Sequence, residues 1–170
     1  AYIYFKTGSG NWGWRGEAKC SFDALNTALG LEGDNAYTID SVIRIEVPDD
    51  LKYIEGYSGK VNLREMYFSP NSQMTNLRPM GSGCGIEKIT LPPLQTSYAD
   101  YMFHTAPNLT TVIFPTTGNI TSLPKEMFKA CTSLQEVTIP EGVTSLGGSF
   151  FSGCSALKRV HLPSTLTSFG

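Results

Sequence analysis

The chain has 170 residues, of which 41% are hydrophobic and 16% are charged, a composition typical of one folded domain with a sizeable core. Its formal net charge of −2 argues against nucleic-acid binding, which needs a basic surface, and no apolar run is long enough to cross a bilayer. We therefore expect no nucleic-acid partner and no transmembrane segment. Composition leaves open whether the chain is cytoplasmic or a mature exported protein.

Residues 1–40 contain no internal repeat, and we interpret them as an N-terminal cap or as the end of a preceding segment. The stretch "YIYFK" predicts a strand, and "SFDALNTALG" predicts a short helix. Trp12 and Trp14 are candidate aromatic contacts for a ligand; the alternative is that they cover the end of the fold. The glycines of "GSGNWG" have the spacing of a dinucleotide-binding loop, but no α/β pattern follows, so we expect no such cofactor.

Residues 41–170 repeat a pattern of about 23 residues in about six units, the last of them incomplete. Each unit follows the pattern L-x-x-V-x-I/L-P, with drift in the early copies. The distance from Leu109 to Leu134 is 25 residues, because the turn "PTTGNI" is two residues longer than "PEGV" in the next unit. We number the units one to six from their first residues, which are Val42, Leu63, Ile86, Leu109, Leu134 and Leu157.

The repeated pattern predicts a mainly β solenoid. The string "LQEVTIP" alternates apolar and polar residues, which indicates a short strand with one buried face, and its proline ends the pairing. The segment "VTSLG" is expected to be extended, and "SFFSGC" to be a tight turn whose phenylalanine fills the interior. One unit cannot bury its apolar residues alone, so we expect stacked units. The predicted parallel strands lie near 43–47, 64–68, 87–91, 110–114, 135–139 and 158–162, in one continuous sheet.

The repeat also assigns the core and the thiols. Cys131 and Cys154 occupy the same slot of successive units, and we predict that both are reduced and shielded rather than joined in a disulfide. The four cysteines form no Cys-x-x-Cys pair and have no histidine pair nearby, so we expect no metal site, no catalytic residue, no cofactor and no enzyme activity. The residues predicted to be buried are Leu109, Val112, Phe128, Leu134, Val137, Ile139, Phe151, Leu157 and Val160.

Two ladders of solvent-facing side chains, running across the predicted strands, form the candidate binding surface. In the first ladder the charges alternate in sign with no like neighbours, which supports the alignment of the units. Tyr67 and Ile113 lie near the middle of the second ladder, where a partner would find apolar contact with a polar rim. The first ladder consists of Arg44, Glu65, Lys88, Thr111, Glu136 and Arg159; the second ladder consists of Glu46, Tyr67, Thr90, Ile113, Thr138 and His161.

The stretch "CTSLQEVTIPEGVTSLGGSFFSGC" resembles the BspA-like leucine-rich repeats of bacterial surface proteins. The resemblance is specific over residues 84–170 and weaker over 41–83. It implies an exported bacterial protein, extracellular or on the cell surface with a lipid anchor in the precursor, often from gut or oral Bacteroidetes, that works by adhesion or binding. Two functions stay open: a module that binds a host or neighbouring-cell protein or glycan, and an accessory lipoprotein or scaffold that docks onto an outer-membrane complex of its own cell.

The chain ends at Gly170, part-way through the sixth unit. We expect the open end to leave Leu162, Leu166 and Phe169 under-covered, because a solenoid needs capped ends. The favoured explanation is a fragment of a longer protein, with an end-to-end dimer through this edge as its consequence in a crystal. The alternative is a tail that folds back to cap itself.

Overall fold

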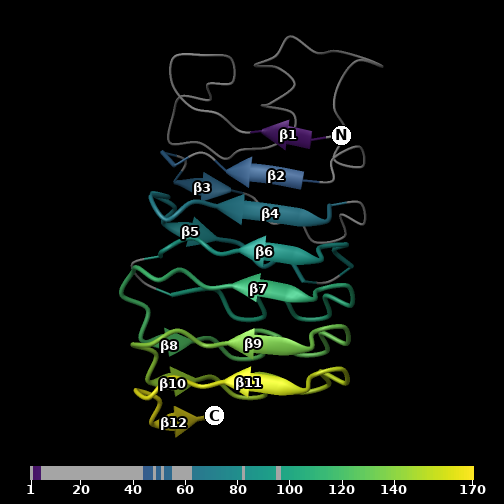
Figure 1. Ribbon diagram of the computed structural model, residues 1–170, viewed down its shortest axis with the longest axis vertical. Helices are drawn as coiled ribbons and strands as arrows, with labels where there is room; N and C mark the ends of the chain where they lie inside the picture. The colour runs from purple at the N-terminus through teal and green to yellow at the C-terminus, as the bar shows by residue number, and fades with distance from the viewer. Residues whose placement is uncertain are drawn as a thin grey trace.

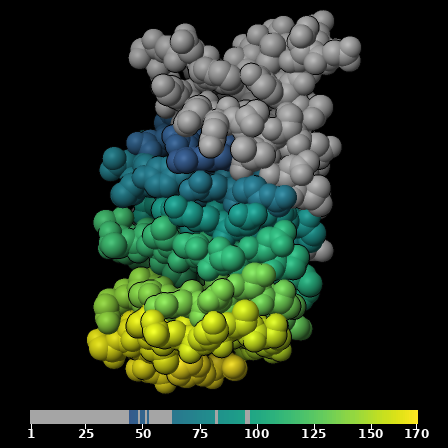
Figure 2. Space-filling model, turned by 45° about the vertical axis from the view of Figure 1, so that its right-hand side comes forward, coloured from purple at the N-terminus to yellow at the C-terminus, as the bar shows by residue number. Residues whose placement is uncertain are grey.

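The structure, a computed structural model, describes residues 2–4, 44–47, 49–50, 52–54, 63–81, 83–94 and 97–170. Within these ranges the chain consists of short strands and turns without a helix. The units stack along the long axis of the molecule, and in the space-filling view they form successive bands in chain order (Figures 1 and 2). The predicted solenoid is confirmed, whereas the helix predicted at 21–30, the "GSGNWG" loop and both tryptophans lie outside the described residues.

The first strand of each unit lies in one column, which we call the first column. All of its pairings are parallel, and every one of the six predicted strands is present. A further strand adds to the N-terminal end by pairing in parallel with β2. The strands of this column are β1 (Tyr2–Tyr4), β2 (Arg44–Val47), β4 (Glu65–Phe68), β6 (Lys88–Thr90), β7 (Thr111–Ile113), β9 (Glu136–Thr138) and β11 (Arg159–His161).

One pairing that the sequence predicted in the first column is not formed. Strands β1, β2, β4, β6 and β7 make one sheet, and β9 and β11 make another. Figure 1 shows β7 standing further from β9 than from β6. The prediction of one continuous sheet is therefore wrong between β7 and β9, and the break falls in the longest unit, which has 25 residues from Leu109 to Leu134.

Shorter strands form a second column on another side of the solenoid. Strand β3 pairs in parallel with β5, and β10 pairs in parallel with both β8 and β12, which confirms the extended conformation predicted for "VTSLG". Residues 97–99, at the corresponding place in unit three, belong to no strand. The second column comprises β3 (Tyr53–Ile54), β5 (Asn76–Leu77), β8 (Ser122–Leu123), β10 (Ser145–Leu146) and β12 (Ser168–Phe169).

Tight turns at residues 100–105, 125–130 and 148–153 form the third side, the turn column. Alternate N–H groups of one turn donate to carbonyl oxygens of the next; the Phe103 N–H, for example, donates to Met127 O at 2.9 Å and the Phe128 N–H to Phe150 O at 3.1 Å. These turns contain residues whose backbone lies in the left-handed region, which residues other than glycine rarely adopt. Those residues are Tyr101, Thr105, Glu126, Ala130 and Ser149, with Gly153 in the last turn.

A stack of aromatic rings fills the interior behind the turn column. The rings of Phe103 and Phe128 are stacked with centroids 5.6 Å apart, and those of Phe128 and Phe151 with centroids 5.9 Å apart. The cysteine thiols lie beside this stack: Cys131 Sγ donates to Phe103 O at 3.1 Å, and Cys154 Sγ to Phe128 O at 2.9 Å. Both cysteines are free, as predicted, but only Cys131 is fully buried.

The predicted core is buried except in the last layer. Six of the nine residues are buried, whereas Phe151, Leu157 and Val160 are partly buried at the edge of the core. The prediction is wrong for these three because no further layer of this chain lies over them. At the same end Leu162 is 49% exposed and Phe169 is 65% exposed.

Candidate ligand-binding site

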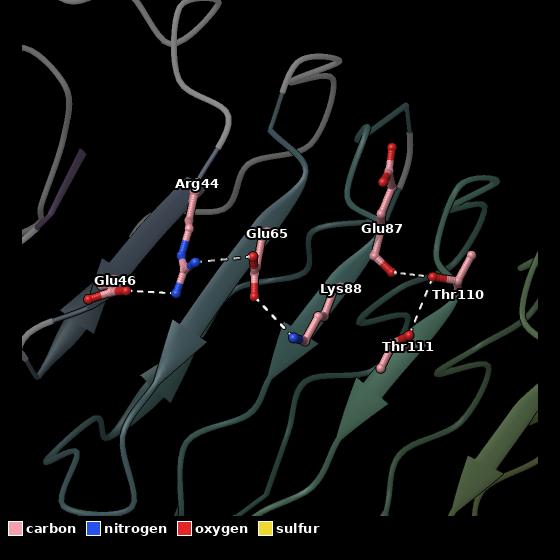
Figure 3. Close-up of polar contacts among 7 residues, drawn as sticks. All are labelled: Arg44, Glu46, Glu65, Glu87, Lys88, Thr110 and Thr111. Atoms are coloured by element: carbon pink, nitrogen blue, oxygen red, sulfur yellow. Dashed lines mark hydrogen bonds and ion pairs between the residues drawn. The ribbon is translucent and has the colours of Figure 1, made fainter. Parts of the chain in front are cut away.

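Charged side chains of the first ladder form ion pairs with their neighbours on the adjacent strands (Figure 3). The strand register places Glu65 between Arg44 and Lys88. Arg44 Nη1 lies 3.6 Å from Glu65 Oε2, and Lys88 Nζ lies 3.3 Å from Glu65 Oε1. Such solvent-accessible pairs contribute little stability. Their effect on the surface is to neutralise each other, so this part of the face presents little unbalanced charge.

The same arrangement recurs beyond the break. Arg159 Nη1 lies 3.3 Å from Glu136 Oε2, and His161 Nε2 lies 2.6 Å from Glu136 Oε1. The hydrogen bond with His161, assisted by the nearby Arg159, lowers the pKa of the Glu136 carboxyl below its usual value. The predicted alternation of charges is therefore confirmed on both sides of the break.

Thr111, the neutral member of the first ladder, lies on β7, at the break itself. It lies beside Lys88 in the paired strands, but no pairing joins it to Glu136. Thr110 Oγ1 donates to Glu87 O at 3.0 Å and lies 3.4 Å from Thr111 Oγ1 (Figure 3). The charge ladder and the sheet thus stop at the same strand.

The second ladder is also divided by the break between β7 and β9. Tyr67, Thr90 and Ile113 are successive neighbours on β4, β6 and β7. Ile113 is 43% exposed, whereas Tyr67 is half-buried and less open than expected. The candidate residues therefore fall into two groups. One group is Arg44, Glu46, Glu65, Tyr67, Lys88, Thr90, Thr111 and Ile113; the other is Glu136, Thr138, Arg159 and His161.

The break is one side of a split between two layers of the solenoid, residues 97–115 above and 121–141 below. Paired strands close with bonds such as Leu91 N–H to Ile113 O and Ile139 N–H to His161 O, at 2.8 and 2.9 Å. The described residues show no corresponding bond from the Phe114 N–H to Thr138 O. In the second column, β8 pairs only with β10 in the described part of the chain. Among the described residues, the layers are therefore not hydrogen-bonded along either strand column.

The split is closed along the turn column. The N–H groups of Tyr101 and Phe103 donate to the carbonyls of Lys125 and Met127 at 3.1 and 2.9 Å. Lys125 Nζ lies 3.7 Å from Asp100 Oδ2 and 5.1 Å from the ring centroid of Tyr101. Since the stacked rings of Phe103 and Phe128 also cross here, the two layers meet on this side and part on the other, which makes the split a wedge.

The longer turn at 115–120 lies at the wedge and lines its pocket. It leans towards the preceding unit, where a Cβ added to Gly118 would lie 3.2 Å from Leu94 O, and Gly118 has a left-handed φ of 114°. The following turn bonds in the other direction: the Ser164 N–H and Oγ each donate to the Glu141 carboxylate at 3.0 Å. Pro124 adds to the separation, because it has no N–H to donate where Gly147 donates to Leu123 O.

The wedge contains a pocket of about 520 Å³, within the size range of small-ligand sites. Its walls are mostly apolar, with threonine hydroxyls and a single carboxylate. The upper layer and the long turn contribute Tyr98, Val112, Ile113, Phe114, Pro115, Thr116, Thr117, Gly118 and Ile120. The lower layer contributes Leu123, Thr138, Pro140 and Glu141.

Tyr98 is held rigidly in the pocket wall. Its hydroxyl donates to Pro92 O at 2.8 Å, and its ring meets Phe114 edge-on with centroids 6.2 Å apart. Burial raises the pKa of the Tyr98 phenol, so the ring stays neutral. Glu141 is the one acidic residue among the described lining residues, and a ligand's charge would be met there.

Sequence reasoning identified Ile113 and Thr138 as surface residues but did not place them in one pocket. The available signal was the 25-residue distance from Leu109 to Leu134, which locates the irregular turn. The proline at position 124 was a second signal, because the equivalent position in the next unit is Gly147.

Other kinds of site have no support in the described residues. No group of three or more His, Cys, Asp or Glu side chains among them is arranged to hold a metal ion. Over the same ranges, the chain has no helix with the length and hydrophobicity needed to span a membrane.

Stacked parallel strands with a buried leucine or isoleucine at the start of units two to five define a leucine-rich repeat solenoid. Residues 79–170, more than half of the chain, match the family described as BspA type leucine rich repeat region (6 copies). The chain belongs to this BspA-type family, which confirms the resemblance inferred from the repeat. Among curated proteins, no relative is found at a significant level.

Three solved structures of bacterial proteins are similar to this chain. A T. pallidum leucine rich repeat protein is 21% identical with a TM-score of 0.49, over 75% of this chain and 73% of that one. A leucine rich cell surface protein from Faecalibacterium prausnitzii is 19% identical with a TM-score of 0.47, over 70% and 38%. A leucine-rich repeat protein from Bacteroides ovatus is 19% identical with a TM-score of 0.43, over 77% and 45%.

Proposed function

We propose that this chain is a non-enzymatic binding module of the bacterial cell surface, which attaches to a protein or glycan of a host or neighbouring cell. Membership of the BspA-type family supports a binding role, because stacked repeats present extended surfaces for recognition. The proposed contact surface is the outer face of β2, β4, β6 and β7.

The observation that carries this proposal is the balance of charge and apolar area on that face. Glu65 is paired with both Arg44 and Lys88, so the charged residues largely neutralise one another. Beside them, half-buried Tyr67 and exposed Ile113 offer apolar contact within a polar rim. A surface of this kind suits recognition of a partner by shape and apolar contact more than by charge.

The test is adhesion of the purified chain to immobilised extracellular-matrix proteins and to a glycan array. Tyr67→Ala should weaken binding by about tenfold, since aromatic anchors dominate interface energies. Tyr101→Ala is the matched control, because Tyr101 is an exposed tyrosine on the turn column. Equal binding by both variants would place the contact elsewhere, and binding only to the outer-membrane fraction of the source bacterium would favour the scaffold role.

A further inference from the structure

The pocket in the wedge interrupts the repeat, whereas the open face beside it is built from equivalent positions of successive units. The regular layers have equivalent neighbours on both sides, whereas this pocket lies at the irregular turn between β7 and β9, two strands that do not pair with each other. Its walls combine apolar side chains from both layers, including exposed Ile113 and the buried ring of Tyr98. Apolar walls of this kind select for an inserted apolar group.

Backbone groups at the pocket lack the partners that the regular layers provide. In the described chain, the Phe114 N–H and the Thr138 carbonyl make no bond across the split, and both residues line the pocket. An extended peptide carries both N–H donors and carbonyl acceptors, so its main chain can satisfy such groups while its side chain enters the pocket. A sugar could bond to the threonine hydroxyls and Glu141, but its ring hydroxyls would also be placed against the mostly apolar walls.

Charge indicates what should flank the inserted group. Among the described residues of the lining, Glu141 is the only charged one. Its carboxylate accepts two bonds from Ser164 and, with about four lone-pair positions, has capacity for another donor. No Lys or Arg is among the described lining residues to compete for it, so a basic side chain of the ligand is the complementary group.

We propose that this pocket binds an extended peptide segment of a partner protein, which inserts one apolar side chain and places an adjacent Lys or Arg beside Glu141. This inference rests on the proposed binding function and names the class of partner. The pocket then sets specificity, and the face of β2, β4, β6 and β7 adds contact area around it.

The test selects short linear peptides, displayed on phage, against the purified chain. The expected peptides share an apolar residue next to Lys or Arg. Thr138→Lys places a cation at the pocket, and we expect affinity for them to fall by about tenfold or more. Thr132→Lys is the matched control, because Thr132 is exposed and lies outside the pocket lining. Glu141→Gln should remove the preference for the basic residue while keeping the apolar one.

A second variant tests the pocket without adding charge. Deletion of Thr117 and Asn119 leaves the turn sequence P-T-G-I-T-S-L, which matches P-E-G-V-T-S-L in the next unit, and should close the wedge and abolish peptide binding. Failure to enrich peptides, equal binding by Thr138→Lys, or selective glycan binding lost in Thr138→Lys would overturn the peptide proposal. If Tyr67-dependent adhesion persists in any of these cases, the proposed function stands while this inference fails.

Discussion

The interface between the layers at 97–115 and 121–141 differs from the regular interface that follows it. In the regular one, β9 pairs with β11, β8 with β10, and the turns at 125–130 and 148–153 bond to each other. In the irregular one, the described residues are hydrogen-bonded along the turn column but along neither strand column. The comparison shows that one bonded column and a ring stack suffice to hold two layers together, which leaves the other columns free to form a binding site.

The largest expected effect is the loss of the ring stack that both interfaces share. Phe128 is fully buried between Phe103 and Phe151 and also meets Phe114 and Phe150 edge-on. Phe128→Ala should lower the free energy of unfolding by about 3–5 kcal/mol, as measured by denaturant titration. Phe151→Ala, in the partly covered last layer, should cost less. A loss below about 1 kcal/mol for Phe128→Ala would mean that the ring stack does not hold the two layers together at the closed side of the wedge.

Shortening the long turn should convert the irregular interface into a regular one. With Thr117 and Asn119 deleted, the Phe114 N–H is expected to bond to Thr138 O and to become protected from hydrogen exchange. Each restored backbone bond contributes about 0.5–1.5 kcal/mol, so stability should rise by about 1–3 kcal/mol. Replacing the same two residues by alanine, without deletion, is the control. Unchanged exchange at Phe114 would show that turn length does not cause the split.

The ion pairs make a smaller and pH-dependent contribution at the regular interface. The His161 hydrogen bond lowers the pKa of Glu136 in the folded protein. The associated stability is therefore present above the ordinary carboxyl pKa and is lost as the pH falls through the lowered one. In an NMR titration, His161→Ala should raise the pKa of Glu136, whereas Lys158→Ala should move it less. Identical titration curves for His161→Ala and the native chain would contradict the contact.

The smallest effect concerns thiol accessibility and leaves stability unchanged. Cys131 bonds across the closed side of the wedge, and burial raises the pKa of its thiol to about 12; Cys154 is partly exposed. We expect a thiol reagent to modify Cys154 before Cys131 in the native protein, and Cys131 only on unfolding, as followed by peptide mass spectrometry. Equal rates at both thiols would show that the wedge also opens along the turn column.

Much of the fold could be predicted because each unit repeats the same local chemistry. The pattern that places Val112 and Val137 on the buried face also fixes the register, and the alternating charges of Glu65 and Lys88 support it independently. The pocket could not be predicted in this way. Two extra residues could have bulged into solvent and left β7 paired with β9. The contact of Gly118 with the preceding unit, and the missing donor at Pro124, decide the outcome through tertiary packing.

The wedge also has a consequence for how order spreads along the chain. In a solenoid, stability is close to a sum of intrinsic and nearest-neighbour terms, so cooperativity passes only from one layer to the next. The coupling is weakest where two of three columns are unbonded. We therefore expect the described residues from 63 to 115 and those from 121 to 170 to form two cooperative blocks, with sub-global opening beginning at their boundary. A ligand that bridges both walls would join the blocks, so binding itself would stiffen the molecule.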